Sequence, residues 1–214
     1  MKMLGVLFVI WILLSIGCFG YSGKIHYVRQ AYSPINPEMV IPVYVDKDFG
    51  AADLVSIAEA VDQWNYVLNG YLVLRMGDRL DEMEIVSKVV NGGIGVVKIK
   101  SLDLDKFDAK LLDHEIEIDG KKVPVYTLGF ADRVGGHMIY LVRDRLGNKD
   151  VKPIVMHELG HVMGSDHVGH GLMTPLYSGE WECVDKISME QVARYWKIPE
   201  WRLNWCYKGD DPLN

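Results

Sequence analysis

Only 3 cysteines occur among the 214 residues, which excludes a small scaffold held together by many disulfides. Positive charge is not in excess either, and the formal net charge of −6 argues against a nucleic-acid-binding protein. The chain has no internal repeat and no low-complexity linker. Its hydrophobic fraction of 49% and charged fraction of 24% are ordinary for a globular protein. A disordered chain, a collagen-like repeat and a coiled-coil rod are therefore excluded.

The length corresponds to one globular domain, with or without a targeting segment. Residues 1–20 are a candidate for such a segment. They contain a positive residue, Lys2, an almost unbroken apolar run over 4–16, and small residues at the end, which is the layout of a secretory signal peptide. The same run is slightly shorter than the roughly 20 residues of a spanning helix, and it would also suit a retained membrane anchor.

Cys18 leaves a third alternative open. The segment LSIGC that ends at Cys18 resembles a bacterial lipoprotein signal, whose cysteine becomes lipidated. All three alternatives place the rest of the chain outside the cytoplasm. We therefore expect one domain over residues 21–214, secreted or anchored at the surface, with membrane contact only through residues 1–20.

Two cysteines follow this segment, Cys183 and Cys206. An even pair in an oxidising compartment suggests a disulfide, and the alternative is two free buried thiols. The bond would close a loop of about 24 residues and contribute roughly 3 kcal/mol in the chain-entropy model.

Hydrophobic periodicity and turn residues predict an α+β domain. Strands are expected over residues 40–46, 71–76, 84–90, 94–100, 114–118, 123–127 and 137–143. Helices are expected over residues 51–69, 153–163 and 188–197.

Three local features refine this assignment. Pro42 favours an edge position for the first strand, because proline cannot donate to a ladder. The run DGKK at residues 119–122 indicates a hairpin. Ser188 and Gln191 have the spacing of a capping box at the start of the last helix.

The strongest chemical signal is HELGHVMGSDH at residues 157–167. His157 and His161 are four residues apart on the predicted helix, so both imidazoles can reach one ion. Gly164 can adopt a positive φ, which lets the chain leave the helix and bring His167 to the same ion. Three neutral nitrogens leave a fourth tetrahedral position for water, as in catalytic zinc sites.

This pattern is specific. A chain with 7 histidines carries HExxH by chance about once in a hundred sequences, and the added glycine and third histidine lower this by a further factor of about 300. A surface helix with unrelated histidines is therefore a poor alternative. We predict one catalytic Zn²⁺ held by His157, His161 and His167, with Glu158 as the general base.

The sequence resembles the metzincin clan of zinc endopeptidases, which combine HExxHxxGxxH with a downstream methionine turn. The segment GLMTPLY at residues 171–177 supplies that turn and, within the clan, resembles the turn of matrixins. The resemblance implies that Met173 lies beneath the metal and that Pro175 and Tyr177 help to wall the substrate pocket. Thr174 departs from the tyrosine usual after this methionine, and the spacing from the third histidine is short. These departures concern the pocket's shape.

The resemblance covers about residues 38–200. It implies a metzincin-like catalytic domain, with a mixed, mostly parallel twisted sheet, an edge strand, an active-site helix and a C-terminal helix. The implied function is a secreted or surface-anchored zinc-dependent endopeptidase, in which Glu158 takes a proton from zinc-activated water and passes it to the leaving amine. A protein or peptide substrate would lie extended along the edge strand around residues 137–141. We expect a monomer.

Two other functions use the same residues. The first is a catalytically silent zinc-containing binding protein of the same fold, which the presence of Glu158 disfavours. The second is hydrolysis of another substrate, such as a cell-wall peptide crosslink, which sequence does not separate from proteolysis.

The remaining candidates are weaker. His170 has a less suitable spacing than the third histidine of the motif. Asp166 is a candidate for orienting a ligand. Asp103, Asp105 and Asp108 alternate with apolar residues, and Ca²⁺ there is not supported by a clear motif, so a solvated acidic turn is the better interpretation.

Overall fold

The computed structural model describes residues 24–31, 34, 37, 39–107, 113–118, 121–176 and 181–209. The predicted targeting segment, residues 1–20 with Cys18, lies outside these ranges. No helix within the described ranges is long and apolar enough to span a membrane.

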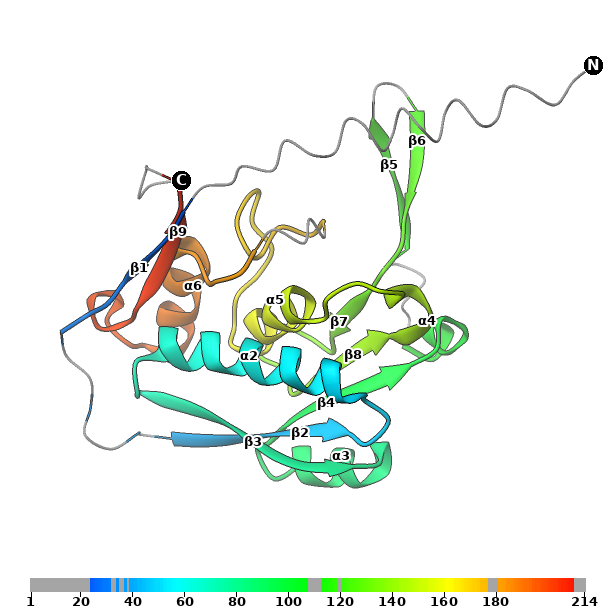
Figure 1. Ribbon diagram of the computed structural model, residues 1–214, viewed down its shortest axis with the longest axis horizontal. Helices are drawn as coiled ribbons and strands as arrows, with labels where there is room; N and C mark the ends of the chain where they lie inside the picture. The colour runs from blue at the N-terminus through cyan, green and yellow to red at the C-terminus, as the bar shows by residue number, and fades with distance from the viewer. Residues whose placement is uncertain are drawn as a thin grey trace, which may run out of the picture.

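A five-stranded sheet forms the centre of the molecule (Figure 1). In spatial order it consists of β3 (Leu72–Leu80), β2 (Met39–Asp46), β4 (Ile94–Ile99), β8 (Met138–Val142) and β7 (Gly129–Ala131). The first four strands are mutually parallel, and β7 runs antiparallel to β8 at one edge. The predicted α+β class with a mixed, mostly parallel twisted sheet is confirmed.

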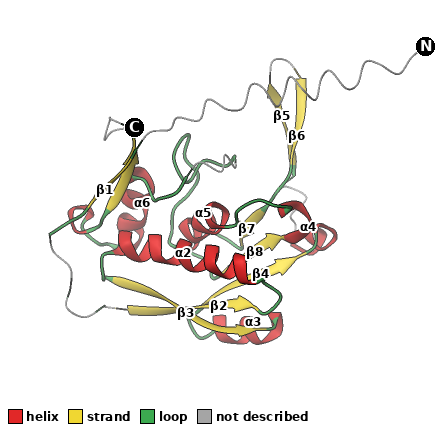
Figure 2. Cartoon of the chain, viewed as in Figure 1, coloured by secondary structure: helices red, strands yellow, loops and turns green. Residues whose placement is uncertain are grey.

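Helices cover both faces of this sheet (Figure 2). α2 (Ala51–Leu68) and α5 (Lys152–Val162) lie on one face, and α3 (Glu82–Val89) lies on the other. β4 alternates between two hydrophobic cores, with Val96 in the core beneath α2 and α5 and Val97 in the core beside α3. The alternation over residues 94–100 predicts a half-buried strand, whereas β4 is buried on both faces except at Lys98.

A buried hydrogen bond positions α5 against α2. Trp64 on α2 is fully buried, and its Nε1 donates to the backbone oxygen of Met156 on α5 at 2.9 Å. With Val155 and Leu159 also buried in the core, one side of α5 is packed against the rest of the molecule. Its other side remains available for a site.

The part of the chain after β8 adds further helices and one strand of a two-stranded sheet. α4 (Arg143–Leu146) follows β8, and α6 (Lys186–Trp196) leads through η3 (Glu200–Arg202) into β9 (Trp205–Lys208). β9 pairs antiparallel with β1 (Ile25–Val28), so segments from the two ends of the described chain lie side by side (Figure 1).

The disulfide between Cys183 and Cys206 is confirmed, with the two Cα atoms 6.2 Å apart. The backbone N–H of Cys206 also donates to the oxygen of Val184 at 3.0 Å. The bond therefore joins the segment that enters α6 to β9.

A hairpin made of β5 (His114–Ile118) and β6 (Lys121–Val125) stands away from the body (Figure 1). It follows η1 (Ser101–Phe107) and leads into β7. The predicted hairpin is confirmed, but β6 begins two residues earlier than expected.

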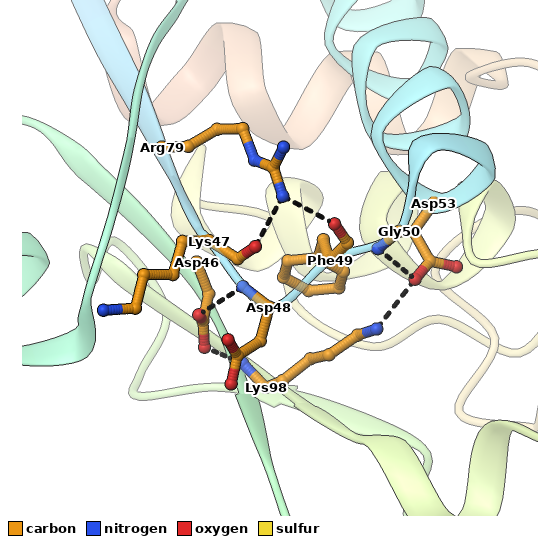
Figure 3. A network of polar contacts seen from close by, with 8 residues as sticks. All are labelled: Asp46, Lys47, Asp48, Phe49, Gly50, Asp53, Arg79 and Lys98. Atoms are coloured by element: carbon orange, nitrogen blue, oxygen red, sulfur yellow. Dashed lines mark hydrogen bonds and ion pairs between the residues drawn. The ribbon is translucent and has the colours of Figure 1, made fainter.

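Charged side chains fix the connection from β2 to α2 (Figure 3). The Asp46 carboxylate accepts hydrogen bonds from the backbone N–H of Asp48 at 2.9 Å and of Lys98 at 3.2 Å. Lys98 Nζ lies 2.7 Å from Asp53 Oδ2 and 4.5 Å from the centroid of the Phe49 ring. Because Asp53 is in the first turn of α2 and Lys98 is in β4, this network ties the helix to the central strands.

Two predictions about the sheet are wrong. The sequence predicts a strand over residues 84–90, but 84–89 belong to α3 and Val90 is its C-cap. The helix begins with a capping box, in which Asp81 Oδ1 accepts from the N–H of Glu84 at 3.0 Å and Glu84 Oε2 accepts from the N–H of Asp81 at 3.1 Å. Pro42 does not mark an edge strand, since β2 lies between β3 and β4. Pairing with β4 begins only at Val43, so Pro42 lies where β2 has one neighbour.

The predicted start of the last helix is also wrong. α6 begins at Lys186, and its N-cap is Asp185, whose carboxylate accepts from both the N–H and the hydroxyl of Ser188. Ser188 and Gln191 therefore form no capping box. Gln191 instead accepts hydrogen bonds from Ser165 and Asp166, in the loop before His167.

Candidate metal centre

α5 carries the first two histidines on one face. Pro153 lies in the first turn, where its missing N–H is not needed, and the helix continues to Val162. His157 and His161 are one turn apart, and their ring centroids are 4.8 Å apart.

The chain reverses immediately after α5. Gly164 has a φ of +97°, a conformation in which glycine is favoured, and the N–H of Ser165 donates to the oxygen of Gly160 at 2.8 Å. A Cβ atom on Gly164 would overlap the ring of Tyr195 on α6. The turn therefore depends on glycine for two reasons, its backbone conformation and the packing of α6.

This reversal brings the third histidine to the other two. His167 Nε2 lies 3.3 Å from His157 Nε2 and 3.2 Å from His161 Nε2. Bonds of about 2.0–2.1 Å at tetrahedral angles place ligand nitrogens about 3.3–3.4 Å apart, so the observed spacing fits one Zn²⁺. Within the described ranges, these histidines are the only group of three or more His, Cys, Asp or Glu residues suited to a metal ion.

Backbone carbonyls orient two of the three rings. His157 Nδ1 lies 2.8 Å from the oxygen of Leu172, and His161 Nδ1 lies 2.9 Å from the oxygen of Ser165. A carbonyl oxygen can only accept, so each Nδ1 carries the proton and each Nε2 presents its lone pair. This is the tautomer required for coordination through Nε2.

Burial keeps these imidazoles neutral. It lowers the pKa of His157 to about 4, with a smaller contribution from a charge on His161. Burial also lowers the pKa values of His161 and His167. Near pH 7 the three rings are therefore in the uncharged form that binds a metal.

Glu158 is the buried carboxylate of the site. It is 5% exposed, and burial raises its pKa to about 8, against a hydrogen bond from the backbone of Ala131 on β7. Among the described residues, its Oε2 atom has no hydrogen-bond partner. A cation held by the neighbouring imidazoles would favour the carboxylate form.

Met173 lies against the metal-binding helix. Its side chain is fully buried, and a Cβ atom on Gly160 would overlap its Sδ. The N–H of Val168 donates to the Met173 oxygen at 3.0 Å, which joins the turn to the segment after the third histidine. The resemblance to metzincins predicts that Met173 lies beneath the metal. The observed packing is compatible with this position, which stays a prediction.

A cavity of about 520 Å³ opens over the histidines. The three rings and Glu158 line it on one side, and residues 129–131 of β7 line it on another. Its apolar lining includes Leu128, Ile154, Leu172, Pro175, Leu176 and Trp181. Pro175 therefore lines this cavity, its role toward a substrate stays a prediction, and Tyr177 lies outside the described residues.

The edge strand at this cavity is not the predicted one. Residues 137–141 lie mostly within β8, which pairs with β4 on one side and β7 on the other. The strand that ends the sheet beside the cavity is β7, a three-residue strand too short to be recognised by alternation.

The weaker candidates take no part in the histidine cluster. His170 is exposed and outside it. Asp166 lines the cavity, and its carboxylate accepts from the backbone N–H of His167 at 2.7 Å rather than from the ring. Asp103 pairs with Lys106 on η1, and Asp108 lies outside the described residues.

Sequence reasoning missed the residues that hold the ligands in place. Asp185 Oδ2 accepts from the N–H of Leu172 at 2.7 Å, and the Leu172 oxygen contacts His157. Gln191 Oε1 contacts the segment that precedes His167. These partners are distant in sequence, and no local spacing indicates them.

No protein-family model matches the sequence, and no curated protein matches it significantly. Among solved structures, the archaemetzincin of Methanopyrus kandleri is 14% identical, with 78% of this chain and 99% of that chain covered and a TM-score of 0.47. Metalloproteinase-II of Bacteroides fragilis is 16% identical, with 86% and 60% covered and a TM-score of 0.42. High choriolytic enzyme 1, a hatching enzyme zinc-protease of Oryzias latipes, is 19% identical, with 60% and 44% covered and a TM-score of 0.31.

This chain thus spans less than two thirds of the last two proteins. The three comparisons are likenesses of fold. The chemistry of the site rests on its own residues and their geometry.

Proposed function

We propose that this protein is a zinc-dependent endopeptidase. The observation that carries the proposal is the convergence of three neutral imidazole Nε2 atoms beside a buried carboxylate, Glu158, in an open cavity bordered by a strand edge. His157, His161 and His167 would hold the metal.

A bound zinc ion would lower the pKa of its water and polarise the scissile carbonyl. Glu158 would accept a proton from that water and deliver it to the leaving amine. Its Oε2 atom is suited to this transfer because, in the described part of the chain, no other group engages it.

The strand edge supports an extended peptide substrate. β7 pairs with β8 on one side only, and its residues line the cavity. A peptide lying along it would form main-chain hydrogen bonds, and its side chains would reach the apolar wall that contains Pro175. The hydrogen bond from Ala131 to Glu158 places the proposed general base next to this strand.

The proposal includes a location outside the cytoplasm, by secretion or by an anchor within residues 1–20. A disulfide between Cys183 and Cys206 supports it, because such bonds persist in oxidising compartments. We propose a monomer and a matrixin-like turn around Met173 as parts of the same hypothesis.

The purified protein, loaded with one equivalent of zinc, is to be incubated with casein, gelatin and peptidoglycan, with and without a chelator. We expect chelator-sensitive cleavage. Glu158→Gln keeps the shape of the side chain and removes its basicity, so it should retain zinc and lose about 10²–10⁴-fold in kcat. Wild-type turnover in Glu158→Gln would exclude this mechanism, and zinc binding without cleavage of any substrate would favour a binding protein.

A further inference from the structure

Gln191 on α6 holds the loop that presents the third histidine. Its Oε1 atom accepts two hydrogen bonds, from Ser165 Oγ at 2.8 Å and from the backbone N–H of Asp166 at 2.6 Å. Both donors belong to the loop between α5 and His167. One amide oxygen therefore joins α6 to two consecutive residues of that loop.

These two residues each contact one of the candidate ligands. The oxygen of Ser165 accepts from His161 Nδ1 at 2.9 Å, and the Asp166 carboxylate accepts from the N–H of His167 at 2.7 Å. Gln191 thus bears on the ring of His161 through Ser165 and on the backbone of His167 through Asp166. Ser165 is fully buried, so water would not readily replace Gln191 as the partner of its hydroxyl.

Other side chains of α6 keep the helix in place without Gln191. Tyr195 packs against Gly164, and Trp196 Nε1 donates to the oxygen of Met163 at 3.0 Å. The Asp185 carboxylate at the N-cap holds Leu172. We therefore expect α6 to stay packed in place without Gln191. The separate contribution of Gln191 is to fix the geometry of the loop that leads to His167.

We infer that Gln191 is a positioning residue of the metal centre, which holds Ser165 and Asp166 so that His161 and His167 meet one zinc ion. This inference rests on the proposed function only in assuming that the ion bound by the three histidines is zinc. A glutamine suits this position because its neutral oxygen accepts both hydrogen bonds without adding negative charge beside Asp166.

The test measures zinc affinity by competition with a chromophoric chelator, independently of proteolysis. Gln191→Met keeps the length of the side chain and removes the acceptor, and we expect about 10–100-fold weaker zinc binding. Gln191→Glu keeps an acceptor at the same reach and should restore most of that loss. With Co²⁺ in place of zinc, Gln191→Met should weaken the visible absorption of the tetrahedral ion.

Gln63→Met on α2 is the matched control. The Oε1 atom of Gln63 has no hydrogen-bond partner among the described residues, so the same substitution there should leave zinc affinity within about twofold of wild type.

In the activity assay, Gln191→Met should lower kcat at saturating zinc while changing KM little, because β7 and the cavity wall are untouched.

A second variant keeps the test decisive if Gln191→Met does not fold. Ser165→Ala removes one of the two donors, and we expect a smaller loss of zinc affinity than for Gln191→Met. If both variants fold, the double variant should lose less than the sum of the two losses, because both act through one contact.

Zinc affinity and a Co²⁺ spectrum equal to wild type in Gln191→Met, or in Ser165→Ala if only that variant folds, would overturn the inference. A wild-type protein that binds zinc but cleaves nothing would remove the proposed function and leave this inference standing. A wild-type protein without zinc affinity would remove both.

Discussion

At the scale of single residues, the site depends on a turn that brings distant ring nitrogens to one point. His157 and His161 need only the helical repeat, which local sequence specifies. His167 needs a reversal at Gly164, whose φ of +97° and contact with Tyr195 leave no room for a Cβ atom. The short motif is informative because both requirements lie within eleven residues of sequence.

Gly164→Ala should therefore destabilise the protein. The positive φ alone costs about 1–2 kcal/mol for a residue with a Cβ, and Tyr195 must also move. At roughly 2–4 °C per kcal/mol for a chain of this size, we expect Tm to fall by at least 2 °C in a calorimetric scan.

Gly169→Ala is the control for this change. Gly169 has no positive φ and no heavy atom within 4 Å of an added Cβ. We expect its Tm to stay within about 1 °C of wild type. Equal Tm values for Gly164→Ala and wild type would contradict the argument from backbone conformation.

At the scale of elements, sequence indicated the long, periodic segments and missed those whose partners lie far along the chain. α2, β4 and α5 were recognised because burial imposes a regular apolar pattern. β1, β7 and β9 have three or four residues each, and they are strands only because of their pairing partners.

Two errors share a different cause, which is competition between local signals. Ile85, Val86 and Val89 in α3 favour a strand, whereas the capping box of Asp81 and Glu84 favours the helix that forms. The spacing of Ser188 and Gln191 predicts a capping box, but Asp185 is the N-cap of α6 and its carboxylate accepts from the N–H of Ser188. The site residues of the motif could be proposed from sequence, whereas the residues that orient them could not.

The hairpin of β5 and β6 is an element held at its base by one ion pair. Arg145 donates to both oxygens of Asp113 at 2.7 Å, and the N–H of Thr127 donates to the same carboxylate at 2.9 Å. The hydrogen bonds from Arg145 hold the pKa of Asp113 below its usual value. The stabilisation contributed by this ion pair is therefore complete above the pKa that Asp113 has in the unfolded chain. It is lost as pH falls through the lower pKa that Asp113 has in the folded protein.

We expect acid to loosen this hairpin before the core. Protection of the β5 and β6 amides from exchange, relative to the unfolded chain at the same pH, should fall below about pH 4, and Asp113→Asn should show the lower protection already at pH 7. Glu115→Gln removes only an exposed pair with Lys122 and serves as the control. Hairpin exchange that is equally slow in Asp113→Asn and wild type at pH 7 would show that the ion pair does not hold the base.

At the scale of the whole molecule, the disulfide connects the metal-site side of the fold to the small terminal sheet. Cys183 lies two residues before Asp185, and Cys206 lies in β9, which pairs with β1. We expect Cys183→Ser together with Cys206→Ser to lower the free energy of unfolding by about 2–4 kcal/mol, measured by urea denaturation. Reduced wild-type protein should match this variant, and a loss below about 1 kcal/mol would mean that packing alone holds the segment.

Two buried groups of the site make the stability of the metal-free protein depend on pH in opposite directions. The pKa of His157 falls to about 4 on folding, so between about 4 and 6.5 the unfolded state binds the extra proton and stability falls as pH falls. Glu158 acts in the opposite direction. Its pKa rises from 4.5 to about 8, so between these values the folded state binds the extra proton and stability rises as pH falls.

The opposite effects of His157 and Glu158 on the free energy of unfolding should therefore largely cancel between about pH 4.5 and 6.5. Glu158→Gln removes the effect of Glu158 and leaves that of His157. In excess chelator, we expect the free energy of unfolding of Glu158→Gln to fall more steeply on acidification than that of wild type, by about 1.4 kcal/mol per pH unit at most. Urea titrations at pH 5.0, 5.7 and 6.4 measure this slope. Parallel curves for the two proteins would mean that Glu158 keeps an ordinary pKa in the folded state, and that its burial does not hold it protonated before metal binds.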